Sequence, residues 1–138
     1  MKANQAKIKY KNCFIISADT IIYAGKKFFN KTQDINVAFH NIKLLAGRRH
    51  TVYTGLTFIN LKEEISFYLT QTKIKFKKLN EKEIKEYLLL EEWKNSAGSY
   101  TIQGYGASFI NFISGSYTSA VGLPLEKVYT ILKKNKLL

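Results

Sequence analysis

Cysteine and proline are almost absent from this sequence. Its 138 residues include one cysteine, Cys13, and one proline, Pro124. A single thiol cannot form a disulfide within the chain, and Cys13 lies in an apolar run, which favours a small core residue over a nucleophile or metal ligand. The two histidines, His40 and His50, are too few and too far from other ligand types to suggest zinc. The composition therefore argues against a disulfide scaffold or a zinc domain.

Long apolar runs are missing as well. No stretch is long enough to cross a bilayer, and residues 1–12 lack the apolar centre of a signal peptide. We therefore expect a cytoplasmic protein that makes no membrane contact. At 138 residues, with no internal repeat and no linker, the chain is expected to form one domain, residues 1–138.

Acidic residues are scarce, and the formal net charge is +12. Such a charge is compatible with nucleic-acid binding, because clustered cations release counterions from phosphates. The positive residues are nearly all lysines scattered from Lys2 to Lys136, and the only arginines, Arg48 and Arg49, are adjacent. We therefore expect a solvated surface that tolerates anionic ligands and has no specific nucleic-acid site. A basic nucleic-acid-binding domain is the alternative that charge alone supports.

The stretch from Cys13 to Thr20, C-F-I-I-S-A-D-T, is the most informative part of the sequence. An apolar run without alternation predicts a strand buried on both faces, inside a sheet covered by helices. Asp19 would then lie at the carboxyl end of that strand, where α/β proteins place functional groups. Asp and Thr also begin turns, and these eight residues taken alone favour the turn.

The rest of the chain alternates helical and strand patterns. Strict alternation over 49–60 and 65–78 predicts two antiparallel strands with one solvated face. Further elements are expected as follows: helices over 2–10, from 32 or 34 to 45, over 80–90 and from Pro124, a hairpin turn at 25–27, and a strand over 109–113. Within the last helix, Leu125, Val128, Tyr129, Ile131 and Leu132 are expected to face inward.

The segment Tyr100–Gly106, Y-T-I-Q-G-Y-G, places Gln103 between strand-like residues and glycines. Glycines allow the backbone to approach a ligand closely, and an amide side chain reads a base edge with a donor and an acceptor together. A hairpin with a polar turn residue explains the same pattern and is favoured when the segment is taken alone.

Six segments together resemble the Maf family of nucleoside triphosphate pyrophosphatases, also called septum-formation inhibitor or Maf-like proteins. They occur in the family's order and spacing over essentially the whole chain: A-D-T-I-I from Ala18, G-K-K-F-F-N-K from Gly25, L-A-G-R-R-H-T-V-Y-T-G from Leu45, F-K-K-L-N-E-K-E-I from Phe76, A-G-S-Y-T-I-Q-G from Ala97 and I-S-G-S-Y-T-S-A-V-G-L-P-L from Ile113. The resemblance implies an α/β fold with an elongated mixed β-sheet flanked by helices, like that of the inosine triphosphate pyrophosphatases. It also implies hydrolysis of a nucleoside triphosphate to the monophosphate and pyrophosphate, with Mg²⁺ or Mn²⁺ as cofactor.

The resemblance assigns roles to five residues and reverses the preference for a turn at Asp19. Asp19 matches the family's catalytic acid–base carboxylate and is the candidate metal ligand. Thr20 and Gln103 match positions linked to substrate choice, Lys31 matches the lysine after the hairpin turn, and Lys2 belongs to the K-A pair ahead of the strand. A-D-T together with I-Q-G resembles the branch that acts on dTTP and UTP rather than on methylated GTP.

Two departures from the family pattern bear on activity. Ser96 stands where family members usually carry a lysine, and the family's Ser-x-Ser-x-x-Arg segment, upstream of the K-A pair, has no match in residues 1–11. We therefore expect the C-terminal two-thirds of a Maf-like domain, either as the enzyme or as a catalytically weak or inactive nucleotide-binding remnant. The family commonly forms homodimers, but no residue of this sequence argues for one.

Overall fold

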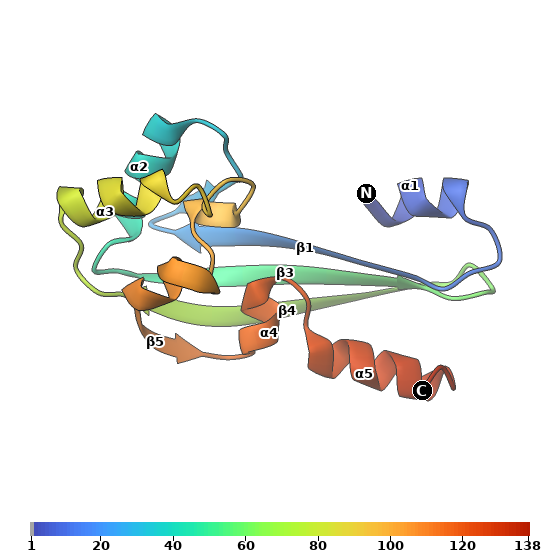
Figure 1. Cartoon of the computed structure of the whole chain (residues 1–138). Coiled ribbons are helices and arrows are strands. Elements are labelled where there is room, and N and C mark those ends of the chain that lie inside the picture. Colours follow the sequence, from blue (N-terminus) through green and yellow to red (C-terminus); the bar gives the residue numbers. More distant parts are fainter. Residues whose placement is uncertain (1) are drawn as a thin grey trace.

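A long antiparallel sheet forms the body of the structure, a computed structural model that describes residues 2–138. The strand order is β2-β1-β3-β4-β5. The short outer strands β2 and β5 pair with only one end of β1 and β4, so the sheet has five strands at one end and three at the other (Figure 1). The strands span Ile15–Ala24 (β1), Lys27–Phe29 (β2), Arg49–Ile59 (β3), Ile65–Phe76 (β4) and Ile110–Ser114 (β5).

Helices cover both ends of this sheet. The main core lies at the five-stranded end, where buried side chains of α2 and α3 pack against Val52 and Ile74. At the three-stranded end, α1 and α5 flank the sheet on opposite sides (Figure 1). The helices span Lys2–Lys9 (α1), Ile35–Leu45 (α2), Glu81–Leu89 (α3), Tyr117–Val121 (α4) and Leu125–Lys134 (α5), with 3-10 turns at Ala97–Ser99 (η1) and Gly104–Phe109 (η2).

The hairpin between β1 and β2 forms as the sequence predicts. Gly25 and Lys26 both adopt positive φ, at 54° and 64°, the backbone that a two-residue hairpin turn requires. The register places Ile22 opposite Phe29, so the chain beyond Phe29 runs back along the edge of β1. This return brings Lys31 toward the middle of β1.

Helix caps explain where α2 and α3 begin. The Asp34 side chain accepts hydrogen bonds from the backbone N–H groups of Asn36 and Val37, at 2.7 and 3.3 Å. Asn80 and Glu83 form a capping box at the start of α3. The predicted helices over 34–45 and 80–90 are therefore confirmed, as are the antiparallel strands β3 and β4 and the short helix α1.

The α/β fold with an elongated sheet flanked by helices is confirmed, but its details differ from the prediction. Every strand pair among the described residues is antiparallel, so the expected mixed pairing is wrong. Asp19 does not end a strand: β1 continues to Ala24, and Asp19 pairs with Gly55 in mid-strand. Between Ile16 and Ile21, β1 has only β3 as a described neighbour, so most of these side chains are half-buried rather than buried on both faces.

Two further predictions near the C-terminus are wrong. Residues 100–106 form no hairpin, because the segment turns into η2 at Gly104. Leu125 and Tyr129 of α5 point outward, with 51% and 57% of their surface exposed, and Ile131 is the buried residue of that helix. Residues 2–138 contain no helix that is both long and apolar enough to span a membrane.

Candidate functional site

One cavity brings together all five residues that the sequence analysis selected. It has a volume of about 220 Å³ and lies beside the middle of β1, with Lys2, Asp19, Thr20, Lys31 and Gln103 among its lining residues. Side chains of β1 and β3, the loop over 95–102 and the end of α4 supply the other walls. Residues far apart in the sequence therefore meet at the point where β2 leaves the edge of β1.

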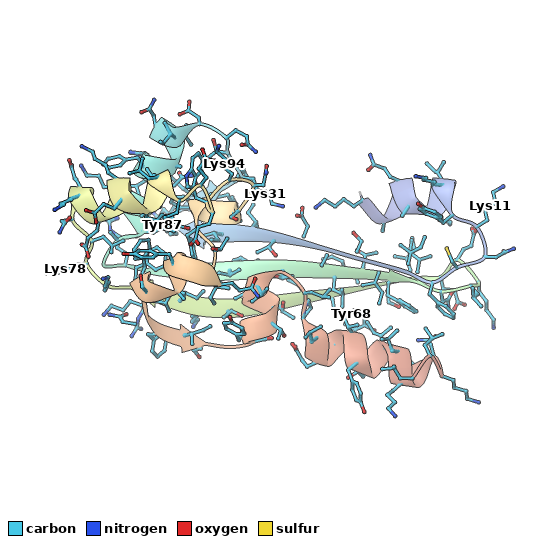
Figure 2. All side chains as sticks on the ribbon, viewed as in Figure 1. Lys11, Lys31, Tyr68, Lys78, Tyr87 and Lys94 are labelled. Atoms are coloured by element: carbon cyan, nitrogen blue, oxygen red, sulfur yellow. The ribbon has the colours of Figure 1, made fainter. Side chains whose placement is uncertain are left out.

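Asp19 is held between two lysines that reach it from different elements. Lys2 Nζ lies 3.2 Å and Lys31 Nζ 3.8 Å from Asp19 Oδ1. Lys2 is the first residue of α1, and the neighbouring Ala3 is buried with Ile15 in the small core that seats this helix on the sheet. Figure 2 shows Lys31 beside the loops at the end of β1.

The charge around Asp19 keeps its carboxylate ionised. Partial burial raises the pKa of Asp19, but the hydrogen bond from Lys2, the positive charges of Lys2 and Lys31 and a backbone hydrogen bond from Thr20 outweigh it, so the net pKa lies below its ordinary value. The side chain is 68% exposed, so an incoming ligand can reach it. The ammonium groups of the two lysines lie around the carboxylate and can attract an anionic ligand.

Thr20 belongs to a row of hydroxyl groups that the sequence analysis did not find. The strand register sets Thr20 beside Thr54 and Thr54 beside Thr70, across β1, β3 and β4. Thr20 Oγ1 lies 3.1 Å from Thr54 Oγ1, the buried Thr54 hydroxyl donates to the Ser119 carbonyl oxygen at 2.7 Å, and Thr70 Oγ1 contacts Ser119 Oγ. These contacts hold α4, whose end at Gly122 lines the cavity. The threonines that alternate along the predicted strands were the sequence pattern from which this row could have been predicted.

The loop on the opposite side of the cavity is fixed by a buried aromatic pair. His50 Nε2 and the Tyr100 hydroxyl lie 2.7 Å apart, and Tyr100 lines the cavity. Burial lowers the pKa of His50 to about 4, although the nearby backbone of Arg48 acts in the opposite direction. His50 is therefore neutral at pH 7 and acts as a structural partner of Tyr100. The sequence raised His50 only as a zinc ligand, and nothing in it indicated the contact with Tyr100.

Gln103 is exposed and directly precedes η2. Its segment is tied to Glu92, a residue to which the sequence assigned no role. Glu92 Oε1 accepts from the backbone N–H of Gly106 at 2.7 Å, and Oε2 accepts from that of Tyr105 at 3.1 Å. Only the structure reveals this contact, because Glu92 lies 11 positions before Gln103 in the sequence.

The site suits a divalent cation that is shared with a phosphorylated ligand. Among residues 2–138, no group of three or more His, Cys, Asp or Glu side chains gathers to hold a metal without help. Asp19 is the one carboxylate among the described residues that line the cavity. Magnesium is commonly bound through one or two carboxylates together with substrate phosphates. The residues present therefore fit a metal that arrives with the ligand.

Comparisons with known proteins match this chain to one family. The family model described as Maf-like protein matches residues 1–135. A dTTP/UTP pyrophosphatase from Wolbachia sp. subsp. Drosophila simulans (strain wRi) is 40% identical over 132 residues, which cover 95% of this chain and 67% of that relative. A nucleoside triphosphate pyrophosphatase from Ehrlichia ruminantium (strain Welgevonden) is 38% identical, over 96% of this chain and 69% of that protein. A dTTP/UTP pyrophosphatase from Rhodopseudomonas palustris (strain BisB18) is 36% identical, over 96% and 64%. The chain thus spans about two thirds of the length of these relatives.

Proposed function

Because the chain belongs to the Maf-like protein family, we propose that it is a nucleoside triphosphate pyrophosphatase that acts on dTTP and UTP. Relatives at 36% and 40% identity are named dTTP/UTP pyrophosphatase. The observation that supports it most directly is the cavity in which an ionised Asp19 stands between Lys2 and Lys31. A triphosphate needs cations to bind, and a carboxylate beside the reacting phosphorus can act as the base that activates water.

In this proposal Lys2 and Lys31 bind the phosphates and thereby change Asp19. Phosphate oxygens compete with the Asp19 carboxylate for the two ammonium groups. As the lysines turn to the phosphates, the causes that lower the pKa of Asp19 weaken, and the carboxylate becomes a stronger base. Substrate binding therefore prepares Asp19 for proton transfer.

The chemical step is attack of water on the α-phosphorus. Asp19 accepts a proton from the water as its oxygen bonds to phosphorus, and the bond from the α-phosphorus to the oxygen that bridges to the β-phosphorus breaks. Pyrophosphate leaves with the bond electrons, and the two lysines offset its developing charge. The products are a nucleoside monophosphate and pyrophosphate.

A divalent cation, Mg²⁺ or Mn²⁺, completes the proposal as cofactor. Asp19 is the side chain that would hold it, together with phosphate oxygens of the substrate. When bound, such an ion neutralises phosphate charge and polarises the phosphoryl group.

Gln103 and Thr20 are the proposed base-recognition residues. The pairing edge of thymine and uracil carries carbonyl acceptors beside an N–H donor, and the Gln103 amide offers a matching donor and acceptor. Thr20 adds a hydroxyl on the other wall of the same cavity.

These substrates are cytoplasmic metabolites, so we propose a cytoplasmic location. The homodimer stays a prediction, which sedimentation velocity checks.

The test is the product pattern with a panel of nucleotides. The purified chain is incubated with dTTP, UTP, dCTP, dATP and dGTP, each with Mg²⁺ or Mn²⁺, and the phosphorus products are resolved by ³¹P NMR. The proposal predicts monophosphate and pyrophosphate in equal amounts, with dTTP and UTP fastest. Release of orthophosphate would contradict it. Nucleotide binding without turnover would instead favour a nucleotide-binding remnant.

A further inference from the structure

The segment that carries Gln103 is folded around the Glu92 carboxylate. Glu92 accepts hydrogen bonds from the backbone N–H groups of Tyr105 and Gly106, at 3.1 and 2.7 Å. The Thr101 hydroxyl lies 3.2 Å from Glu92 Oε1 and 2.7 Å from the carbonyl oxygen of Gln103. One carboxylate therefore contacts the segment both before and after Gln103.

Gly104 passes close to the Glu92 carboxylate in a backbone conformation that favours glycine. Gly104 has a φ of +70°, and a Cβ atom there would lie 2.5 Å from Glu92 Oε2. The chain thus passes directly against the carboxylate one residue after Gln103. The hydrogen bonds from Tyr105 and Gly106 to Glu92 therefore hold the backbone that presents the Gln103 side chain.

The Glu92 carboxylate interacts with this segment rather than with a cationic side chain. Within residues 2–138 it takes part in no ion pair, although the chain carries a net charge of +12. The neighbouring Glu91, in contrast, is exposed and pairs with Lys94 at 2.7 Å. Glu92 does not line the cavity itself, so any influence on a ligand must pass through the segment that it holds, in which Thr101 and Gln103 line the cavity.

We propose that Glu92 is a positioning residue that sets the Gln103 amide and thereby determines which nucleotide base the site accepts. This inference rests on the proposed function, because it assigns Glu92 a part in base selection by the same cavity. Glu92 does not touch the reacting phosphate, so it acts on discrimination between substrates more than on the rate of the chemical step.

The main test compares Glu92→Gln with Glu91→Gln. In Glu92→Gln an amide NH₂ replaces one of the oxygens that accept backbone N–H groups, so one of those donors loses its acceptor. We expect the KM for dTTP and UTP to rise about tenfold, while the KM for the poorly used nucleotides changes less than about twofold. Glu91→Gln should leave every constant unchanged.

Two other measurements separate positioning from general destabilisation. Amide hydrogen exchange at Tyr105 and Gly106 should become faster in Glu92→Gln and stay as in the parent in Glu91→Gln. Thr101→Val keeps the side-chain shape but removes the hydroxyl, and it should shift nucleotide preference in the same direction. This second variant decides the question if Glu92→Gln does not fold.

Two results for Glu92→Gln would overturn the positioning role while leaving the proposed function intact. One is an equal loss of activity with every nucleotide. The other is an unchanged nucleotide preference although amide exchange shows that the segment has become mobile. If the parent releases no pyrophosphate, calorimetric binding of dTMP, UMP and GMP takes the place of KM in the same comparison. A parent that neither hydrolyses triphosphates nor binds monophosphates contradicts the proposed function and this inference with it. Unchanged amide exchange in Glu92→Gln contradicts this inference alone.

Discussion

Lys2 Nζ lies 3.2 Å from Asp19 Oδ1, and Lys31 Nζ lies 3.8 Å from the same oxygen. The three side chains are 59%, 48% and 68% exposed for Lys2, Lys31 and Asp19 respectively. Exposed ion pairs contribute little to stability, because water screens them and the side chains lose freedom on pairing. The consequence of this arrangement therefore lies in the charge state of Asp19 and in the attraction of anions.

Replacing Lys2 with Met should make Asp19 easier to protonate. The hydrogen bond and charge of Lys2 both lower the pKa of Asp19, so their removal raises that pKa. If Asp19 is the base, the acid limb of the kcat/KM profile, which reports the free enzyme, moves to higher pH, because a base works only when ionised. Lys7→Met is the control, since Lys7 lies on the same helix and pairs with Glu63 at 2.8 Å. An unchanged acid limb would show that Lys2 does not influence the pKa of the catalytic base.

Replacing Gln103 with Ala should change the ranking of nucleotides. Loss of a base-edge contact acts on discrimination, so the ratio of kcat/KM for dTTP over purine nucleotides should fall about tenfold or more. Gln71→Ala, at an exposed position of β4, controls for loss of an amide elsewhere. A uniform loss with every triphosphate would instead make Gln103 structural.

Replacing Thr54 with Val should destabilise the fold and loosen the cavity wall. The Thr54 side chain is fully buried, and its hydroxyl donates to the Ser119 carbonyl oxygen. Removing that donor costs about 1–3 kcal/mol, because a buried acceptor loses its partner. Urea unfolding measures the loss. The half-buried Thr51 of the same strand gives the control Thr51→Val, which should change the unfolding free energy by less than about 0.5 kcal/mol.

The sequence predicted the helices and strands better than it predicted the residues that support the site. Strict alternation in β3 and β4 and the caps at Asp34 and Asn80 are local signals, and the structure confirms them. The resemblance to the Maf family selected five residues, and all five line one cavity. Nothing local showed that β1 would extend past Asp19, because strand pairing with β3 decides where the strand ends.

Residues that support the site from a distance were missed for a related reason. Glu92 binds backbone N–H groups, and any residue but proline offers that donor, so no side-chain pattern records the contact. The threonine row depends on the register of three strands, which the sequence does not specify to within one residue. Tertiary pairing, rather than local preference, determines both features.

Acid should destabilise the fold through His50. Burial lowers the pKa of His50 to about 4, below the ordinary value of 6.5, so the unfolded chain binds the proton more readily between these values. Stability is therefore lost as the pH falls from about 6.5 toward 4, by about 3 kcal/mol for this one group. Urea unfolding at several pH values measures it. His50→Gln should flatten the dependence in this window, and His40→Gln, at the exposed histidine, should retain it.

The most direct measurement of the central claim is pyrophosphate release by Asp19→Asn. The amide keeps the size of the side chain but removes the charge that proton transfer or metal binding requires. The account predicts that release from dTTP and UTP falls by about 10² to 10⁴-fold, with an unchanged far-UV spectrum. Glu86→Gln, which removes an exposed carboxylate on α3, should release pyrophosphate like the parent. An Asp19→Asn chain that hydrolyses dTTP as fast as the parent would contradict the account.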